Sequence, residues 1–187
     1  MILNRFWRAP RNTTIAALYG VIVAQARAPE FYTFYGVPDT AEGRLEMIIL
    51  HAALLISRLE VEEGPARPLG QALFDHFCSD VDGNLREMGV GDLAVPRKMK
   101  AVAEAFYGRK RVYDTALAIP GNEQLEAALV RNVPTAASDT ARMSALAAYM
   151  RECSRKLAAM EGAALLQGRA DFADPAAFIV KSTMGAA

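Results

Sequence analysis

The chain has 187 residues, of which 52% are hydrophobic and 22% charged, a composition typical of a globular protein and not of a disordered one. This length suits one domain with a substantial core and is short for two. The formal net charge is zero, which argues against a general nucleic-acid-binding protein. The two cysteines, Cys78 and Cys153, are far apart and in no CxxC spacing, which argues against a disulfide framework and suits a reducing compartment.

The N-terminal segment can be interpreted in two ways. Three arginines precede an apolar run that ends in Ala24, Gln25 and Ala26, the outline of a signal peptide with its cleavage site. The apolar residues of the same run also recur at helical spacing, and we therefore favour an amphipathic first helix over residues 12–28. Residues 1–11 would then form a basic and aromatic arm that touches anionic lipid or a partner, or simply frays.

An aromatic segment and a strongly apolar helix come next. Residues 29–38 are expected to form a short turn of helix that covers an edge of the core. Asp39 and Glu42 have the spacing of a capping box and open a long helix that reaches about Glu63. Its uninterrupted apolar part, residues 47–56, is about half of the roughly 20 residues that a membrane span needs. We interpret it as the buried centre of the core, with its histidine hydrogen-bonded inside the protein.

Four further helices are expected in the remainder of the chain. One covers residues 69–88 and ends at Gly89, and the next begins near Pro96 and is interrupted near Gly108. The last two cover residues 121–132 and 138–161, and we find no alternating strand of useful length. The pattern predicts an all-α, single-domain bundle of about six helices over residues 12–168. Residues 169–187 are expected to be a peripheral tail.

Residues 74–92 gather metal-ligand residue types in a short space, but they do not fit a known metal site. Counted from Asp80, positions 3 and 5 of a calcium loop are Asp82 and Asn84, whereas the required glycine and glutamate are replaced by Leu85 and Gly91. His76 and Cys78 are two residues apart, so on a helix they point in nearly opposite directions and cannot share one zinc ion. We predict no metal and no other cofactor.

The sequence also lacks the motifs of the common catalytic sites. It contains no GxSxG, no GxxxxGK[ST] and no strand-borne GxGxxG motif. Cys78 has helical spacing with Phe74, Val81 and Leu85, so it is expected to point inward as a small buried hydrophobe and not to serve as a nucleophile. We therefore predict no catalytic residues and a protein that is not an enzyme.

The helix at residues 69–88 is amphipathic, and its polar side faces outward. Its apolar stripe consists of Leu73, Phe77, Val81, Leu85 and Met88. Asp75, Ser79, Asp82 and Arg86 recur on the opposite side, and Asp82 and Arg86 have the spacing of an intrahelical ion pair. The following helix adds a concentrated basic surface made of Arg97, Lys98, Lys100, Arg109, Lys110 and Arg111. These faces are either ordinary solvated surfaces or a means of orienting a partner.

Residues 85–117 also carry a family resemblance. The segments "REMGVGD" at 86–92, "KMK" at 98–100 and "AEAFYGR" at 103–109 resemble the ubiquinol–cytochrome c chaperone family. Residues 31–51, "FYTFYGVPDTAEGRLEMIILH", and 128–133, "ALVRNV", support the resemblance, which spans most of the chain.

This resemblance implies an assembly factor and not a catalyst. Relatives act in building the ubiquinol–cytochrome c reductase, respiratory complex III, where they associate with newly made cytochrome b, work with a small partner protein and can sit near the ribosome exit. The present chain begins almost directly at the family domain. The resemblance therefore implies a bacterial member that acts in the cytoplasm as a peripheral protein at the inner membrane.

Client binding needs exposed apolar or aromatic area bordered by charge. The candidate contact residues are Asp75, Ser79, Asp82, Arg86, Asp92, Lys98, Lys100, Tyr107, Arg109, Phe34 and Tyr35. The alternative is an RNA- or ribosome-associated protein that uses the basic helix at residues 97–111, although no specific nucleic acid is indicated.

Overall fold

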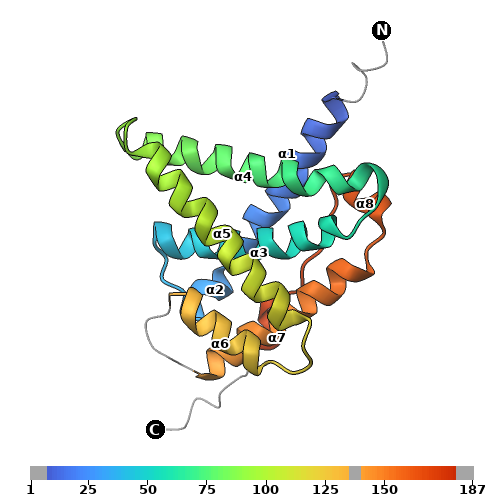
Figure 1. Ribbon diagram of the computed structural model, residues 1–187. Coiled ribbons are helices and arrows are strands. Elements are labelled where there is room, and N and C mark those ends of the chain that lie inside the picture. The colour runs from blue at the N-terminus through green and yellow to red at the C-terminus, as the bar shows by residue number, and fades with distance from the viewer. Residues whose placement is uncertain (1–7, 135–139, 180–187) are drawn as a thin grey trace.

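The computed structural model describes residues 8–134 and 140–179 of the chain. Its elements are α1 (Arg8–Ala26), α2 (Pro29–Thr33), α3 (Ala41–Glu60), η1 (Gly64–Ala66), α4 (Arg67–Glu87), α5 (Val95–Leu117), α6 (Glu123–Asn132), α7 (Thr140–Ala159), α8 (Gly162–Leu166) and η2 (Pro175–Phe178). Six of these helices have ten or more residues, and the described residues form no strand. The predicted all-α bundle of about six helices is confirmed (Figure 1).

α3 is the central helix of the bundle. Residues 49–56 are all buried, because α1, α4, α5 and α7 each pack against α3. A helix that is apolar all round needs such complete covering, which is what the sequence of this segment predicts. Among the described helices, none combines the length and the apolar character that crossing a membrane requires.

α4 and α5 form an antiparallel hairpin whose closed end lies at an outer corner of the molecule (Figure 1). α4 ends where the sequence predicts, since Gly89 adopts a φ of 79° that other residues rarely take. The Gly89 N–H donates to the Arg86 carbonyl at 2.9 Å, and the Val90 N–H donates to the Leu85 carbonyl at 3.0 Å. This pair of bonds caps the helix and turns the chain within a few residues toward α5.

Several helix boundaries differ from the predicted ones. α1 begins at Arg8, so residues 8–11 of the expected arm are helical, and residues 1–7 lie outside the described residues. The cap of α3 is Thr40, whose side chain accepts from the Gly43 N–H at 3.2 Å, whereas Asp39 pairs with Arg44 at 2.6 Å. α5 is continuous through Gly108. The expected cap of α7 at residues 138–139 also lies outside the described residues.

The segment after α8 is not peripheral over its described part, residues 169–179. Phe172 and Ala173 are each only 5% exposed, and Pro175 is buried. The Ala173 carbonyl accepts from Gln25 of α1 at 2.9 Å, and the Phe172 carbonyl accepts from Lys156 of α7 at 2.9 Å. Much of this segment has no helical period, which is why its apolar pattern does not reveal its burial in the sequence.

Candidate functional site

The predicted outward face of α4 is present and ends in a small network of charges. Asp75, Ser79 and Arg86 are exposed, and Asp82 is half-buried. The Arg86 guanidinium pairs with Asp82 at 2.7 Å, which confirms the predicted intrahelical ion pair, and it also pairs with Asp92 at 2.5 Å. Arg86 therefore links α4 to the loop that leads into α5, and these predicted residues do lie together.

The apolar side of α4 packs on the core except at its end. Phe77 is fully buried and Cys78 is half-buried. Met88, which the sequence pattern assigns to the apolar stripe, is 68% exposed, because it follows the last turn of α4 and lies beyond the part that packs on the core. The prediction that Met88 belongs to the core-facing stripe is therefore wrong.

The basic residues of α5 do not form one free surface. Arg109 is largely covered and makes two hydrogen bonds to the Glu46 carboxylate of α3, at 2.5 and 2.6 Å. Burial raises the pKa of Glu46, and the adjacent Arg109 opposes that rise. Lys110 is 9% exposed and pairs with Glu60 at 2.7 Å and Asp114 at 2.8 Å.

These pairs weaken the case for RNA binding. Burial disfavours the charge of Lys110, but its hydrogen bonds to Asp114 and Glu60 outweigh that effect and raise its pKa. Lys98 is exposed, and Lys100 lies 3.8 Å from Glu104. Part of the basic helix is thus already neutralised by acidic residues of the protein itself.

The two aromatic residues that directly follow α2, both predicted to contact a client, have different environments. Phe34 is 53% exposed. Tyr35 is 1% exposed, and its hydroxyl donates to the Pro175 carbonyl at 2.7 Å. Tyr35 therefore holds the C-terminal segment to the core and cannot contact a partner in this fold, contrary to the expectation from the sequence.

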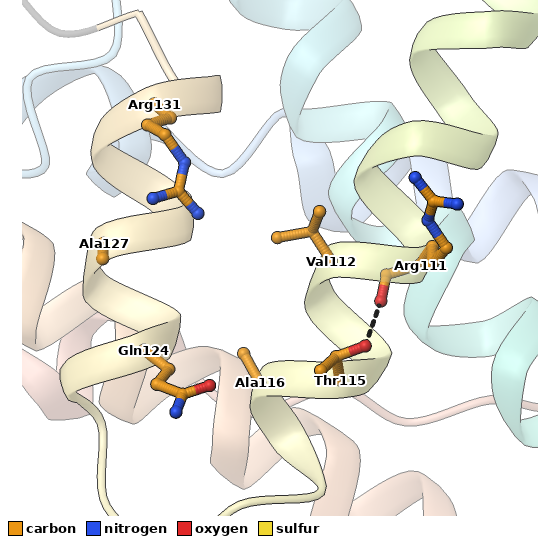
Figure 2. Close-up of a pocket in the computed structure, with 7 residues that line it drawn as sticks. All are labelled: Arg111, Val112, Thr115, Ala116, Gln124, Ala127 and Arg131. Atoms are coloured by element: carbon orange, nitrogen blue, oxygen red, sulfur yellow. Dashed lines mark hydrogen bonds between the residues drawn. The ribbon is translucent and has the colours of Figure 1, made fainter.

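Three hollows lie side by side along α5 and α6. The first has a volume of about 600 Å³ and is lined by Glu104, Tyr107, Gly108, Lys110, Arg111, Asp114 and Thr115. The second, about 420 Å³, lies between the two helices and is lined by Arg111, Val112, Thr115, Ala116, Gln124, Ala127 and Arg131 (Figure 2). The third, about 390 Å³, is lined by Glu42, Glu46, Arg109, Val130, Arg131, Asn132, Val133 and Pro134. Neighbouring hollows share lining residues, and we call them together the α5 surface.

The α5 surface combines exposed apolar groups with unpaired positive charge. Tyr107 is 49% exposed and Val130 is 52% exposed. Figure 2 shows Arg131 reaching from α6 into the space beside α5, with Arg111 on the outer side of α5. Within the described part of the chain, neither arginine forms an ion pair. Tyr107 and the basic residues at positions 109–111 were singled out from the sequence, whereas the residues of α6 were missed, because only the packing of α6 on α5 brings them into the surface.

The α5 surface continues onto α4. The Phe74 and Tyr107 rings lie 4.8 Å apart, centre to centre. Burial raises the pKa of Tyr107, and the nearby Cys78 and Asp75 add to the rise. The Phe74 side chain thus joins α4 to Tyr107, and the outward face of α4, which includes Asp75, ends at the loop that carries Asp92.

His51 and the two cysteines, which are candidate catalytic residue types, lie in buried or half-buried positions. His51 is fully buried, its Nδ1–H donates to the Met47 carbonyl at 2.6 Å, and its Nε2 accepts from the Tyr149 hydroxyl at 2.6 Å. Burial raises the pKa of Cys153 to about 11 and also raises that of Cys78. In residues 8–134 and 140–179, no three His, Cys, Asp or Glu side chains form a group that could hold a metal ion.

Comparison with known proteins gives one consistent result. A family model described as ubiquinol–cytochrome C chaperone matches residues 34–172, a range that includes α4, α5 and α6. The chain is also similar to the crystal structure of the Cbp3 homolog from Brucella abortus, with 38% sequence identity and a TM-score of 0.84. That alignment covers 94% of this chain and 98% of the Brucella chain. A search of curated proteins finds no match.

Proposed function

Because this chain belongs to the ubiquinol–cytochrome c chaperone family, we propose that it binds newly made cytochrome b during assembly of the ubiquinol–cytochrome c reductase, respiratory complex III. The family match over residues 34–172 is the observation that carries the proposal. The buried, neutral His51 and the two thiols with raised pKa values support a binding role over a catalytic one.

We place the client contact on the α5 surface and the adjoining outward face of α4. A cytochrome client offers apolar helices joined by charged loops, and binding it calls for apolar area bordered by charge. Tyr107 and Val130 supply exposed apolar area, while Arg111 and Arg131 supply charge that no acidic group of the described residues neutralises. This arrangement suits a client segment that combines apolar side chains with carboxylates.

The test is affinity purification of the tagged full-length protein from its own membranes, followed by quantification of cytochrome b by mass spectrometry. The informative variant carries Arg111→Glu and Arg131→Glu, and the control carries Arg155→Glu, an exposed arginine of α7 outside the α5 surface. We expect cytochrome b with the wild type and the control, and a loss of about tenfold in the double variant, because like charges repel across an interface.

The outcomes separate the function from the site. Absence of cytochrome b in the wild-type sample would contradict the proposed function. Equal recovery with the wild type and the double variant would leave the function in place and remove the client from the α5 surface. Circular dichroism of each variant checks that the helical fold is retained.

A further inference from the structure

The closed end of the α4–α5 hairpin, residues 88–94, exposes apolar side chains to water. Leu93 is 99% exposed and Met88 is 68% exposed. In the loop between Met88 and Leu93, Gly89 and Gly91 have no side chains, and the side chain of Val90 is half-buried. A single exposed apolar side chain is ordinary, whereas exposed apolar side chains that are grouped together mark interaction sites. Here two of them, Met88 and Leu93, belong to the same short loop.

The hairpin end also carries an excess of positive charge. Residues 86–100 contain four basic side chains and two acidic ones. Arg86 already pairs with one of the acidic groups, Asp92. Arg97 and Lys98 are exposed and form no ion pair within the described residues. Lys100 is 78% exposed and has only a long contact with Glu104.

The order of these groups along the hairpin fits the profile of a membrane surface. α5 begins at Val95, so at about 1.5 Å per residue Lys98 and Lys100 lie roughly 5 to 8 Å along its axis. An interfacial segment buries its apolar part about 5–10 Å deep and keeps its cations at the level of the headgroups. Leu93 and Met88 occupy the apolar position, and the basic side chains of α5 occupy the headgroup position.

From this arrangement we propose that the hairpin end docks on an anionic phospholipid surface. Leu93 and Met88 enter the boundary between the headgroups and the acyl chains, and Arg97, Lys98 and Lys100 contact the lipid phosphates. A lipid surface admits a convex apolar point without a preformed pocket, whereas a protein partner would need a matching hollow. Docking at this end leaves the α5 surface, which begins at Glu104, free for a client.

The chain offers a matched control for this proposal. Val61, just after α3, is 75% exposed, so it is as accessible as Met88. Its neighbours are Glu60, which pairs with Lys110, Glu62, which pairs with Arg58, and Glu63, which forms no ion pair within the described residues. This place therefore offers no excess of positive charge to anionic lipid. Hydrophobic exposure alone therefore predicts lipid contact at both places, and the present proposal predicts it only at the hairpin.

The first experiment measures flotation of the purified full-length protein with protein-free vesicles. Wild type is expected to float with vesicles that contain phosphatidylglycerol and much less with pure phosphatidylcholine. Combined Leu93→Ser and Met88→Ser is expected to lower the bound fraction about tenfold or more, since two apolar side chains lose their burial. Arg97→Gln with Lys98→Gln should remove most of the preference for anionic lipid. Val61→Ser should float like the wild type.

The second experiment locates the contact directly. A single tryptophan is placed by Leu93→Trp or by Val61→Trp, each in a Trp7→Phe background, and its quenching by brominated phospholipid is measured. Quenching is expected for Leu93→Trp and not for Val61→Trp.

Three outcomes would overturn the proposal. The first is that the wild type fails to float with anionic vesicles. The second is that Leu93→Ser with Met88→Ser floats normally, which would move lipid binding to another part of the chain. The third is that the wild type does not bind vesicles and the same variant no longer recovers cytochrome b in affinity purification, which would assign the hairpin end to the client. Because the vesicles contain no protein, this test does not depend on the proposed function.

Discussion

His51 is a polar residue at the centre of an apolar core, and its two ring nitrogens are both occupied. Nδ1 donates to Met47 of its own helix, and Nε2 accepts from Tyr149 of α7, whose oxygen also accepts from Gln25 of α1. These contacts tie three helices together through one neutral imidazole. A protonated ring would lose the bond from Tyr149 and would place a charge where there is no water.

The stability of the protein should therefore depend on pH through His51. Burial lowers the pKa of His51 from 6.5 to about 4. Above pH 6.5 the ring is neutral in both states, and as the pH falls toward 4 the unfolded chain takes up the proton first. The free energy of unfolding should fall by roughly 3 kcal/mol across that window.

Denaturant unfolding at a series of pH values measures this dependence. In His51→Gln the slope between pH 6.5 and 5 should be shallower, because the amide does not titrate there. The stability at neutral pH should be lower, because the amide lacks the ring that packs against Phe31 and Phe172. His76→Gln is the control, since His76 is exposed. Equal slopes in the wild type and His51→Gln would show that the buried ring is not the titrating group.

At the scale of elements, two helical glycines have opposite roles. A Cβ atom at Gly43 would lie 2.0 Å from the Pro38 carbonyl oxygen, a backbone atom that holds the entry to α3. A Cβ atom at Gly108, in the middle of α5, would meet nothing within 4 Å. The first glycine permits a close approach, and the second only weakens its helix.

Alanine at these two positions should therefore change stability in opposite directions. Gly43→Ala should destabilise by about 1 to 3 kcal/mol through the clash with Pro38. Gly108→Ala should stabilise by about 0.5 to 1 kcal/mol, because alanine favours the helix and open space receives its methyl group. Chemical denaturation of both variants measures the sign of each change in the free energy of unfolding. Destabilisation by Gly108→Ala would indicate a local break in α5 that the structure does not contain.

The sequence predicts those elements whose signals are local. The end of α4 follows from Gly89, and the ion pair of Asp82 and Arg86 follows from their spacing, so both were predictable. By contrast, Arg109 pairs with Glu46 of α3, 63 residues away in the chain, and Lys110 pairs with Glu60 of α3, 50 residues away. No local sequence pattern indicates these two distant pairs. For the same reason the hollows between α5 and α6 could not be predicted, because they depend on how two helices pack.

At the scale of the whole molecule, the C-terminal segment closes the bundle. Backbone carbonyls of residues 172, 173 and 175 accept hydrogen bonds from α7, α1 and Tyr35, respectively. The Phe172 ring stands edge-on to His51, with ring centres 5.0 Å apart. The segment thus joins the first and last long helices and seals the buried histidine from water.

Phe172→Ala should accordingly destabilise the whole fold and not only its C-terminal end. Loss of the buried ring should cost about 3 to 5 kcal/mol, through lost burial and the cavity left beside His51. Water admitted to that cavity would also move the pKa of His51 back toward 6.5 and flatten the dependence of stability on pH below that value. Phe178→Ala is the matched control, since Phe178 is only half-buried and should cost less. Thermal unfolding of the two variants, followed by the pH series on Phe172→Ala, tests both effects. A Phe172→Ala protein as stable as the control would mean that the segment is peripheral after all.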